Sequence, residues 1–516
     1  MVPELIAPVH SRVDIGWVRA HPWRLVVGGE LVPAISGRTY ENASPVTEDI
    51  VCELPDGNAD DVEAAVTAGQ AAMVEWAKCP PRERARIVRS LAAIVREHKE
   101  ELAALDAIDV GNAYTPMLGD VEVGADTLEF MADAALFLAG ETYNDTTTHL
   151  HYTRREPIGV VARIVAFNHP IMFAIQKIAA PLVAGNAVIL KPSDLSALSA
   201  LRMGELFADA LPKGLLSVLV GKGPELPRAI VRHPEVRRIG FIGSEMTGRA
   251  IQRDAADVAV KDISLELGGK NAIIVCSDVD VATAAQGVVK GMNFQGWQSQ
   301  SCSSTSRLFV HEDAADALLD EVVKLIAKIR IGDPLDPTTQ MGTLASQAQF
   351  DKTFRYIAAA QEDGARLLTG GVRPSRLAGK TGLYVEPTVF DNVGPDSRLA
   401  REEVFGPVLS TFRWTDEAEV VRLANSVRYG LTGAVWSNDI SQAHRVAHAL
   451  HTGFVWINDA ASHFTGVAFG GYKGSGIGKE ESVEELLSYS QSKTINLRLA
   501  PESHISQSNA PIRSRI

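Results

Sequence analysis

From Gly159 onward, short apolar runs alternate with longer segments whose apolar residues recur at helical spacing. The runs at 159–167, 187–190 and 236–242 (GVVARIVAF, AVIL and VRRIGFI) are mostly apolar, as expected for strands buried on both faces of a parallel sheet. Between the first two runs, residues 170–182 have the pattern of a helix. A second unit of the same kind begins at 271–278 (NAIIVCSD). This alternation predicts a doubly wound α/β architecture, in which ligands bind outside the carboxyl ends of the strands.

The residues before this region are expected to form scaffold. Residues 1–22 read as an irregular arm. Asp60 with Glu63 forms a capping-box pattern ahead of a helix. Apolar residues at helical spacing predict a second helix that follows Pro81 and reaches Leu102, and a third over about 121–138.

Charge and cysteine usage narrow the function classes. The chain has 516 residues, enough for two or three domains, and its 50 Lys and Arg against 63 Asp and Glu leave a net charge of −13. Because that excess repels nucleic acid and anionic membranes, we expect neither as a partner. The four cysteines show no CxxC spacing, which argues against disulfides or a zinc knuckle. The N-terminus has no signal-peptide pattern and no apolar run reaches about 18 residues, so we expect a cytoplasmic protein.

Two segments rich in β-formers lie outside the α/β pattern. Residues 146–155 (TTTHLHYTRR) and 488–499 (SYSQSKTINLRL) both alternate with polar residues on each face. This pattern indicates strands that leave the main body of the protein. Two interpretations stay open, a pair that joins another chain and an ordinary edge hairpin.

One cysteine stands in an unusual stretch. Residues 294–307 (FQGWQSQSCSSTSR) place Cys302 among small polar residues. A thiol is a nucleophile only as its thiolate, which amide dipoles or cations stabilise. Four hydroxyl residues follow Cys302, which suits a wet, hydrogen-bonded loop better than a core. The alternative is a buried structural cysteine, since free cysteines are among the most buried residues.

A nucleotide site is only weakly marked. No GxGxxG occurs, and 379–381 (GKT) lacks the earlier glycine of a P-loop. The segment 243–248 (GSEMTG) lies between a strand and a helix, where its amides could face a pyrophosphate or simply form the turn. At 191–194 (KPSD), Lys191 offers a cation for a phosphate or ribose and Asp194 a carboxylate for a ribose diol. The same two residues would serve equally as a surface pair of little energetic weight.

Seven motifs occur in order between residues 167 and 476. They are FNHP (167–170), KPSD (191–194), FIGSEMTG (241–248), LELGGKN (265–271), the Cys302 loop, EEVFGPV (402–408) and FGGYKGSG (469–476). The series resembles the aldehyde dehydrogenase superfamily, and the likeness extends from about residue 25 to 499.

The resemblance implies an α/β fold of two doubly wound Rossmann-like domains plus a small β oligomerisation element. The implied divisions are an N-terminal arm at 1–22, a dinucleotide-binding domain at 23–140 and 156–265, oligomerisation strands at 141–155 and 485–499, a catalytic thiol domain at 266–484 and a polar tail at 500–516. A homodimer or homotetramer follows from the same likeness.

The resemblance also implies a reaction, the NAD(P)-dependent oxidation of an aldehyde to its acid with water as the acyl acceptor. Cys302 resembles the nucleophile, and Asn168, with the Cys302 backbone N–H, resembles the donor pair for the oxyanion. By itself, an asparagine before a His-Pro step is more often a helix cap. Glu266 resembles the base that activates the deacylating water. Lys177 and Glu480 match positions linked to proton exit.

Further residues are implied for the two ligands. The implied cofactor-binding residues are Lys191, Ser193, Asp194, Phe241, Gly243, Ser244, Gly248, Leu267, Gly268, Glu403 and Phe405. The implied substrate-pocket residues are Phe167, His169, Met172, Phe173, Gln176 and Ser301. Because Asp194 would repel a 2′-phosphate, we expect NAD as the cofactor, with NADP possible. Because this pocket reads as apolar and without a cation, we expect neutral aldehydes rather than succinic semialdehyde, unless a cation comes from the loop around His463.

The chain departs from the family pattern at four positions. Ser299 replaces the usual glycine of the cysteine motif, and its added Cβ is expected to crowd or restrict the thiol loop. Phe167 replaces a tryptophan, Asp194 a glutamate and Ala468 a proline. None of these changes removes a reacting group.

Other functions were weighed against these residues. A CoA-acylating relative would lack the glutamate at 266, and a non-catalytic relative would not need Cys302, Asn168 and Glu266 together. His444, His448 and His451 share one face of an expected helix, a spacing that zinc sites can use. No carboxylate or cysteine accompanies them at that spacing, so we expect no metal.

Overall fold

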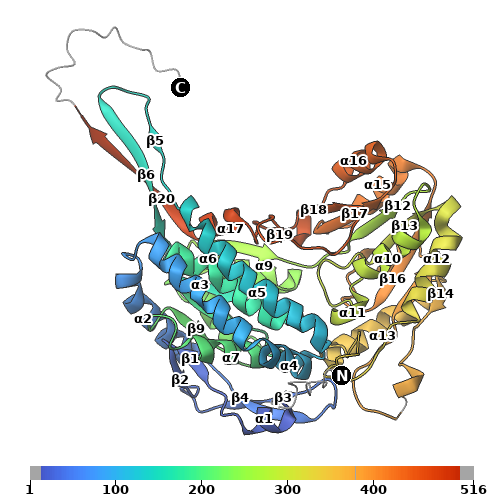
Figure 1. The fold of residues 1–516 in the computed structure, drawn as a ribbon, viewed down its shortest axis with the longest axis horizontal. Coiled ribbons are helices and arrows are strands. Elements are labelled where there is room, and N and C mark those ends of the chain that lie inside the picture. The colour runs from blue at the N-terminus through green and yellow to red at the C-terminus, as the bar shows by residue number, and fades with distance from the viewer. Residues whose placement is uncertain (1–12, 378, 500–516) are drawn as a thin grey trace, which may run out of the picture.

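The structure is a computed structural model that describes residues 13–377 and 379–499, and two large sheets with flanking helices dominate it (Figure 1). The first sheet has eight strands in the order β19-β11-β10-β7-β8-β9-β1-β2, of which the five from β11 to β9 are parallel. Its strands are β1 (Leu25–Val27), β2 (Glu30–Val32), β7 (Val160–Ile164), β8 (Ala187–Lys191), β9 (Leu216–Val218), β10 (Val236–Ile242), β11 (Asp262–Glu266) and β19 (Gly476–Ile477).

The second sheet has seven strands in the order β14-β15-β16-β13-β12-β17-β18, all parallel except the antiparallel β14. Its strands are β12 (Ala272–Val275), β13 (Arg307–His311), β14 (Arg366–Thr369), β15 (Thr388–Asp391), β16 (Val408–Trp414), β17 (Thr432–Trp436) and β18 (Phe454–Ile457). The prediction of doubly wound α/β architecture is therefore confirmed, whereas the domain boundaries given above stay predictions.

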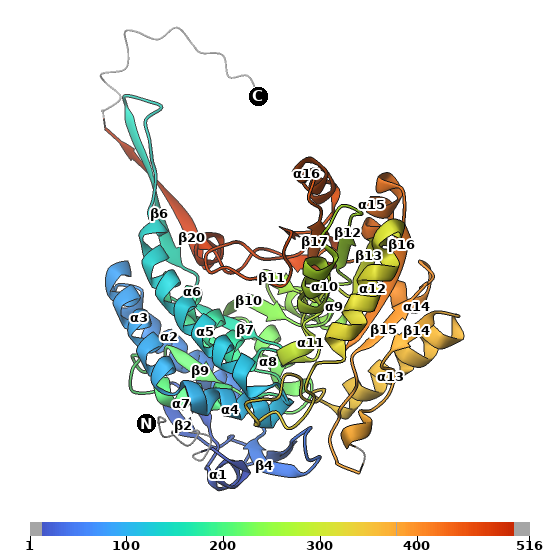
Figure 2. The same cartoon turned by 45° about the vertical axis from the view of Figure 1, so that its right-hand side comes forward.

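Helices connect the strands and cover both large sheets (Figures 1 and 2). In chain order they are α1 (Ile15–Ala20), α2 (Ala59–Trp76), α3 (Pro81–Glu97), α4 (Lys99–Val110), α5 (Tyr114–Ala134), α6 (Pro170–Ala184), α7 (Leu198–Phe207), α8 (Glu225–Arg232), α9 (Glu245–Ala256), α10 (Val281–Gly291), α11 (Phe294–Trp297), α12 (Glu312–Ile326), α13 (Gln347–Glu362), α14 (Arg398–Arg401), α15 (Glu417–Asn425), α16 (Ile440–Ala449) and α17 (Val483–Ser488). Across the described ranges, no helix combines the length and apolarity needed to cross a bilayer.

The apolar strands are buried because both of their faces carry a core. Along β12, Ile273 and Val275 belong to one hydrophobic cluster, while Ala272 and Ile274 belong to a second cluster on the opposite face. Successive residues of a strand point to opposite faces. An apolar run without polar alternation is therefore the sequence signature of this covered sheet.

Three expectations for the N-terminal part are wrong in detail. Within the described part of the arm, Asp14 caps the short helix α1, and Val18 on that helix is buried, so this part is not irregular. The capping residue of α2 is Asn58 rather than Asp60. The helix after Pro81 ends at Glu97, so Leu102 lies on the separate helix α4.

A three-stranded sheet extends away from the body of the molecule (Figures 1 and 2). It consists of β5 (Thr142–Tyr143), β6 (His149–Pro157) and β20 (Ser490–Arg498), and β20 pairs antiparallel with β6 over its whole length. The two polar segments predicted as strands are thus partners within one chain. A separate small sheet pairs β3 (Thr39–Ala43) with β4 (Ile50–Pro55).

Candidate active site

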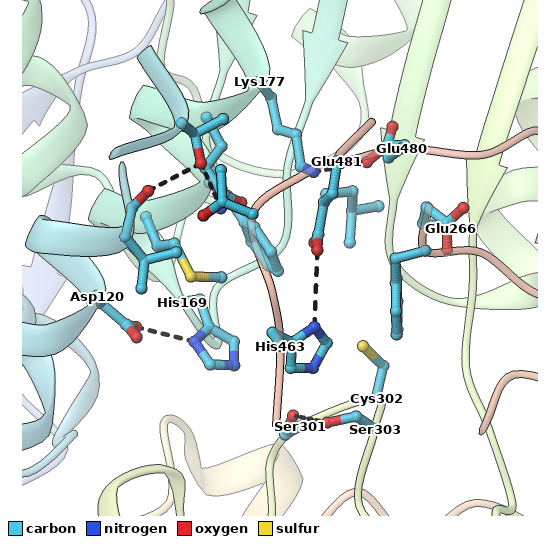
Figure 3. A pocket seen from close by; sticks show the side chains of 18 of the residues that line it. Asp120, His169, Lys177, Glu266, Ser301, Cys302, Ser303, His463, Glu480 and Glu481 are labelled. Carbon is cyan, nitrogen blue, oxygen red and sulfur yellow. Dashed lines mark hydrogen bonds and ion pairs between the residues drawn. The ribbon is translucent and has the colours of Figure 1, made fainter. Parts of the chain in front are cut away.

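Two cavities meet beside Cys302 and Glu266, and both residues line each of them. The larger cavity, of about 540 Å³, lies at the carboxyl ends of β7, β8, β10 and β11. The smaller cavity, of about 260 Å³, lies between α5, α6, the Cys302 loop and the loop at 461–469 (Figure 3). We call them the groove and the tail pocket.

The Cys302 loop is held by buried side chains. Asn271 Nδ2 donates to the carbonyl oxygens of Cys302 (2.7 Å) and Ser304 (3.0 Å). The hydroxyls of Ser301 and Ser303 bond each other at 3.1 Å. Ser303, Ser304 and Thr305 are all buried. The expectation of a wet loop is therefore wrong, since three of the four hydroxyl residues after Cys302 are buried, and the hydroxyls of Ser303 and Ser304 bond within the protein.

The thiol lies in surroundings that favour its protonated form. Burial, followed by the nearby carboxyl groups of Glu266 and Glu403, raises the pKa of Cys302 to about 12. These surroundings differ from the cationic ones expected for a reactive thiol. The Cys302 thiol is therefore protonated at neutral pH.

Asn168 presents an unpaired amide to the groove. Its side chain is 3% exposed, and its Nδ2 has no hydrogen-bond partner among the described residues. The N-cap of α6 is His169, and the side chain that bonds the first turn of that helix is Asp106, whose Oδ2 accepts from Ile171 N at 3.1 Å. Asn168 is thus not a helix cap. Its amide lies beside Cys302 along the groove, with its two hydrogens free for a ligand.

Glu266 is the last residue of β11 and is 7% exposed. Within residues 13–377 and 379–499, neither of its carboxyl oxygens has a hydrogen-bond partner. Burial, with a smaller effect from Glu480, raises the pKa of Glu266 well above its usual range. A carboxyl group with a raised pKa is a better proton acceptor once ionised.

Lys177 and Glu480 form a buried ion pair beside Glu266. Lys177 Nζ lies 2.8 Å from Glu480 Oε2, and Arg163 Nη2 lies 2.7 Å from Glu480 Oε1. Burial alone would raise the pKa of Glu480, but the two cations lower it to about 2. Glu480 is therefore ionised throughout the physiological range and fixes both cations.

Most of the residues predicted to bind a cofactor come together along the groove. Those that line it are Lys191, Ser193, Asp194, Phe241, Gly243, Ser244, Leu267, Gly268, Glu403 and Phe405. Gly248 does not line it. A Cβ at Gly248 would meet the Leu267 side chain at 2.9 Å, so this glycine allows α9 to pack closely. Ser244 caps α9 by accepting from Thr247 N.

The glycines of LELGGKN make room for one carboxylate. A Cβ at Gly268 would overlap the carboxyl group of Glu403, and Gly269 N donates to Glu403 Oε1 at 2.9 Å. Phe405 has a φ of +58° and meets Phe167 edge to face at 5.8 Å between ring centroids. Phe167 therefore lies on the groove and not in the tail pocket where it was expected.

Two polar residues of the groove were missed from the sequence. Gln349 Nε2 donates to the carbonyl oxygens of Val404 (2.9 Å) and Phe405 (2.6 Å), and Lys352 also lines the groove. Both lie on α13, which carries none of the seven motifs. An amphipathic helix of this kind has no local signal for a ligand site.

The tail pocket contains the other predicted substrate residues, and it is more polar than expected. His169, Met172, Phe173, Gln176 and Ser301 line it. Lys177 lines it as well, but its ammonium group is engaged by Glu480. Asp120, Trp297 and Glu481 also line it and were missed from the sequence, whereas the loop around His463 was named there as a possible source of a cation. Trp297 belongs to the Cys302 loop and could have been found there, whereas Asp120 on α5 gave no signal.

The three histidines considered for a metal do not share a helix. His444 and His448 lie on α16 with stacked rings, but α16 ends at Ala449, so His451 follows the helix. In the described part of the chain, no group of three His, Cys, Asp or Glu residues is placed to hold a metal ion.

The fold and site define an α/β protein in which a cysteine stands where a dinucleotide-sized groove meets a second pocket. Residues 32–495 match the model of the aldehyde dehydrogenase family. The chain is 42% identical over 488 residues to aldehyde dehydrogenase tropH of Talaromyces stipitatus, covering 93% of this chain and 94% of that protein.

Solved structures agree with this match. An indole-3-acetaldehyde dehydrogenase of P. syringae in complex with NAD+ and IAA has a TM-score of 0.89 at 35% identity, covering 92% of this chain and 96% of its own. Betaine aldehyde dehydrogenase of Staphylococcus aureus in complex with NAD+ has a TM-score of 0.91 at 34% identity, covering 95% and 97%. The chain belongs to the aldehyde dehydrogenase family, as predicted from its seven motifs.

Proposed function

We propose that this protein oxidises an aldehyde to the carboxylic acid, with NAD as the hydride acceptor and water as the acyl acceptor. The observation that carries the proposal is the meeting of three groups along the groove, two of which have no hydrogen-bond partner among the described residues. They are the Cys302 thiol, the Asn168 amide and the Glu266 carboxyl group.

The groove fits a dinucleotide. It opens at the carboxyl ends of parallel strands, where α/β sheets bind such ligands. Lys191, which is 5% exposed, and Asp194 lie at the end of β8, and Asp194 Oδ2 accepts from Gly223 N at 3.1 Å. A carboxylate there would accept from a ribose hydroxyl and repel a 2′-phosphate, so NAD is preferred over NADP.

Cys302 and Asn168 perform the first half of the reaction. The Cys302 sulfur bonds to the aldehyde carbon as the thiol loses its proton, and Glu266 lies close enough to both cavities to receive it. The carbonyl oxygen then carries negative charge, which the unpaired Asn168 amide and the Cys302 backbone N–H stabilise. NAD, when bound, supplies the acceptor for the hydride, and a thioester on Cys302 remains.

Glu266 performs the second half. Its carboxylate removes a proton from a water, the water oxygen bonds to the thioester carbon, and the Cys302 thiolate leaves. Glu266 releases each proton to solvent through the two cavities before it acts again, because Glu480, which is paired with Lys177 behind it, stays ionised and cannot accept one. A glutamate free of internal partners at this point supports water, and not CoA, as the acyl acceptor.

Two wider proposals accompany this reaction. The sheet of β5, β6 and β20 leaves the body of the molecule with an exposed edge, which supports a homodimer or homotetramer joined through it. The four cysteines are free in this structure, which supports a reducing compartment such as the cytoplasm.

The test is to incubate the protein with NAD and a panel of aldehydes and to follow absorbance of the reduced cofactor. Hexanal and benzaldehyde should exceed succinic semialdehyde in kcat/KM, because the only tail-pocket ammonium among the described residues, Lys177, is already paired. Cys302→Ala should bind NAD in calorimetry but oxidise no aldehyde. Normal turnover by Cys302→Ala, or a dependence on CoA, would contradict the proposed function.

A further inference from the structure

The tail pocket is lined by a glutamine whose amide oxygen has no hydrogen-bond partner among the described residues. Thr127 Oγ1 donates to Val123 O at 2.8 Å, so its oxygen can only accept from Gln176, whose Nε2 lies 3.1 Å away. This fixes the orientation of the amide. Gln176 is 4% exposed, and within the described ranges its Oε1 has no partner. Because Gln176 lines the tail pocket, this oxygen needs a donor from the ligand.

His169 presents a second acceptor. Its Nδ1 lies 2.8 Å from Asp120 Oδ2, and the same carboxyl oxygen accepts from Trp297 Nε1 at 3.3 Å. A carboxylate only accepts, so Nδ1 carries the hydrogen. The neutral ring then has its lone pair on Nε2. Figure 3 shows the His169 ring between Asp120 and the interior of the pocket.

His463 repeats this arrangement from another element. It lies on the loop at 461–469, with Nδ1 3.7 Å from Glu481 Oε2. Figure 3 shows His463 between Glu481 and the Cys302 loop. The tautomer with its hydrogen on Nδ1, facing this carboxylate, would offer Nε2 as an acceptor. Gln176 and His169 belong to the α6 region and His463 to the loop at 461–469, so these three side chains line the pocket from separate elements.

Part of the remaining wall is apolar. Met172, Phe173, Phe464 and Phe469 line the same cavity of about 260 Å³. Phe173 and Phe469 each contact one of the two histidine rings, at 5.4 and 4.9 Å between centroids. Aromatic and thioether groups suit an aromatic ring. Three acceptors set in such walls suit a ring that carries a hydrogen-bond donor.

We infer that the substrate is an aromatic aldehyde whose ring bears an O–H or N–H donor, read by Gln176 together with His169 and His463. This rests on the proposed function, because the aldehyde carbon must reach Cys302. A carboxylate in place of the donor would face the Gln176 oxygen without a hydrogen to give. An analogue that carries neither a donor nor a carboxylate would leave the Gln176 oxygen desolvated and unpaired.

The test compares isomers that differ in one hydrogen-bonding property. 4-(Hydroxymethyl)benzaldehyde and 4-methoxybenzaldehyde contain the same atoms, but only the first can donate; the 3-substituted pair is the second arm. Indole-5-carbaldehyde and its N-methyl derivative test the N–H source in the same way. The donor member of at least one pair should have a kcat/KM higher by roughly tenfold or more. Equal values within every pair would overturn the inference.

Variants assign the effect to the acceptors. Gln176→Met keeps the side-chain length and removes the amide, and His463→Phe keeps a ring and removes the nitrogen. Each should bring the donor-to-methoxy ratio toward one, because the ratio is taken within one variant and is independent of its total activity. Met172→Leu is the matched control on the same wall, where the ratio should persist. A ratio that survives in both Gln176→Met and His463→Phe would also overturn the inference.

Failure of the inference and failure of the proposed function give different results. If benzaldehyde is oxidised but the donor and methoxy isomers have equal kcat/KM, the proposed function stands and the inference is rejected. If no aldehyde is oxidised, calorimetry on Cys302→Ala with each isomer still decides the matter. Tighter binding of the donor isomer, lost in the double variant with Gln176→Met, supports the inference, and equal binding rejects it.

Discussion

Replacing Ser299 with glycine should stabilise the protein. Ser299 has a φ of +58°, in the left-handed region, and it is 2% exposed. Its Oγ is buried with no hydrogen-bond partner in the described part of the chain. The substitution Ser299→Gly would remove both unfavourable features at once, and Ser299 N would still donate to Asn293 O at 2.7 Å.

The magnitude follows from three contributions. A non-glycine residue in the left-handed region costs about 1–2 kcal/mol, and an unpaired buried hydroxyl costs about 1–3 kcal/mol. Glycine itself lowers the free energy of unfolding by about 1 kcal/mol, because it loses more backbone conformational entropy on folding than serine does. The net gain in free energy of unfolding should be about 1–4 kcal/mol.

The assay is the midpoint of urea unfolding, compared with Ser303→Gly. Ser303 is buried to a similar extent and lies in the same loop, directly after Cys302. Its φ is not positive, and its hydroxyl forms a hydrogen bond with that of Ser301. The control should lose stability while Ser299→Gly gains it. A lower midpoint for Ser299→Gly would show that the serine at this position is accommodated without strain.

Four other predictions concern the site and the assembly. Iodoacetamide should label Cys302 in the free enzyme with a rate that rises about tenfold per pH unit and reaches no plateau by about pH 10, because the thiol pKa is raised to about 12; a plateau near neutral pH would contradict the buried neutral thiol. Glu266→Gln should release a burst of reduced cofactor near one per site and then stall, as seen by stopped-flow absorbance, since hydrolysis lacks its base; unchanged steady turnover would exclude that role. NAD should exceed NADP in kcat/KM, and Asp194→Asn should narrow the ratio; a preference for NADP in the unaltered enzyme would reject the reading of Asp194. Deletion from Ser488 removes β20 and leaves β6 without its partner, so the product should be insoluble or inactive in size-exclusion and activity assays; an active monomer would count against assembly through this sheet.

The motifs, through their resemblance to the family, predicted most of the positions that line the two cavities. Gly268 and Glu403 are far apart in the sequence, yet each lies in a motif of its own, and the structure places the glycine where a Cβ would overlap the carboxyl group. Cys302, Asn168 and Glu266 were found for the same reason. Turns at strand ends restrict which residues fit, so they leave a recognisable pattern.

The polar character of the tail pocket could not be predicted in this way. Asp120 lies on a helix whose pattern reads only as amphipathic, and its role depends on a contact with His169, 49 residues away. The raised pKa of Cys302 also depends on Glu266 and Glu403, whose approach only the fold defines. A run of hydroxyl residues looks the same in sequence whether its bonds are to water or to the protein.

The ion pair between β7 and the C-terminal region has a consequence for how the protein is made. Arg163 and Lys177 lie in the first α/β unit, but the carboxylate that balances them, Glu480, is near the end of the chain, and β19 closes the same sheet beside Glu266. During synthesis, the Arg163 and Lys177 side chains therefore lack their buried carboxylate partner until residue 480 has left the ribosome. Until then they must stay solvated, or the core around them must stay incompletely packed. The first α/β unit cannot complete its packing early, and translation that stops before this residue should yield a chain that chaperones retain and proteases remove.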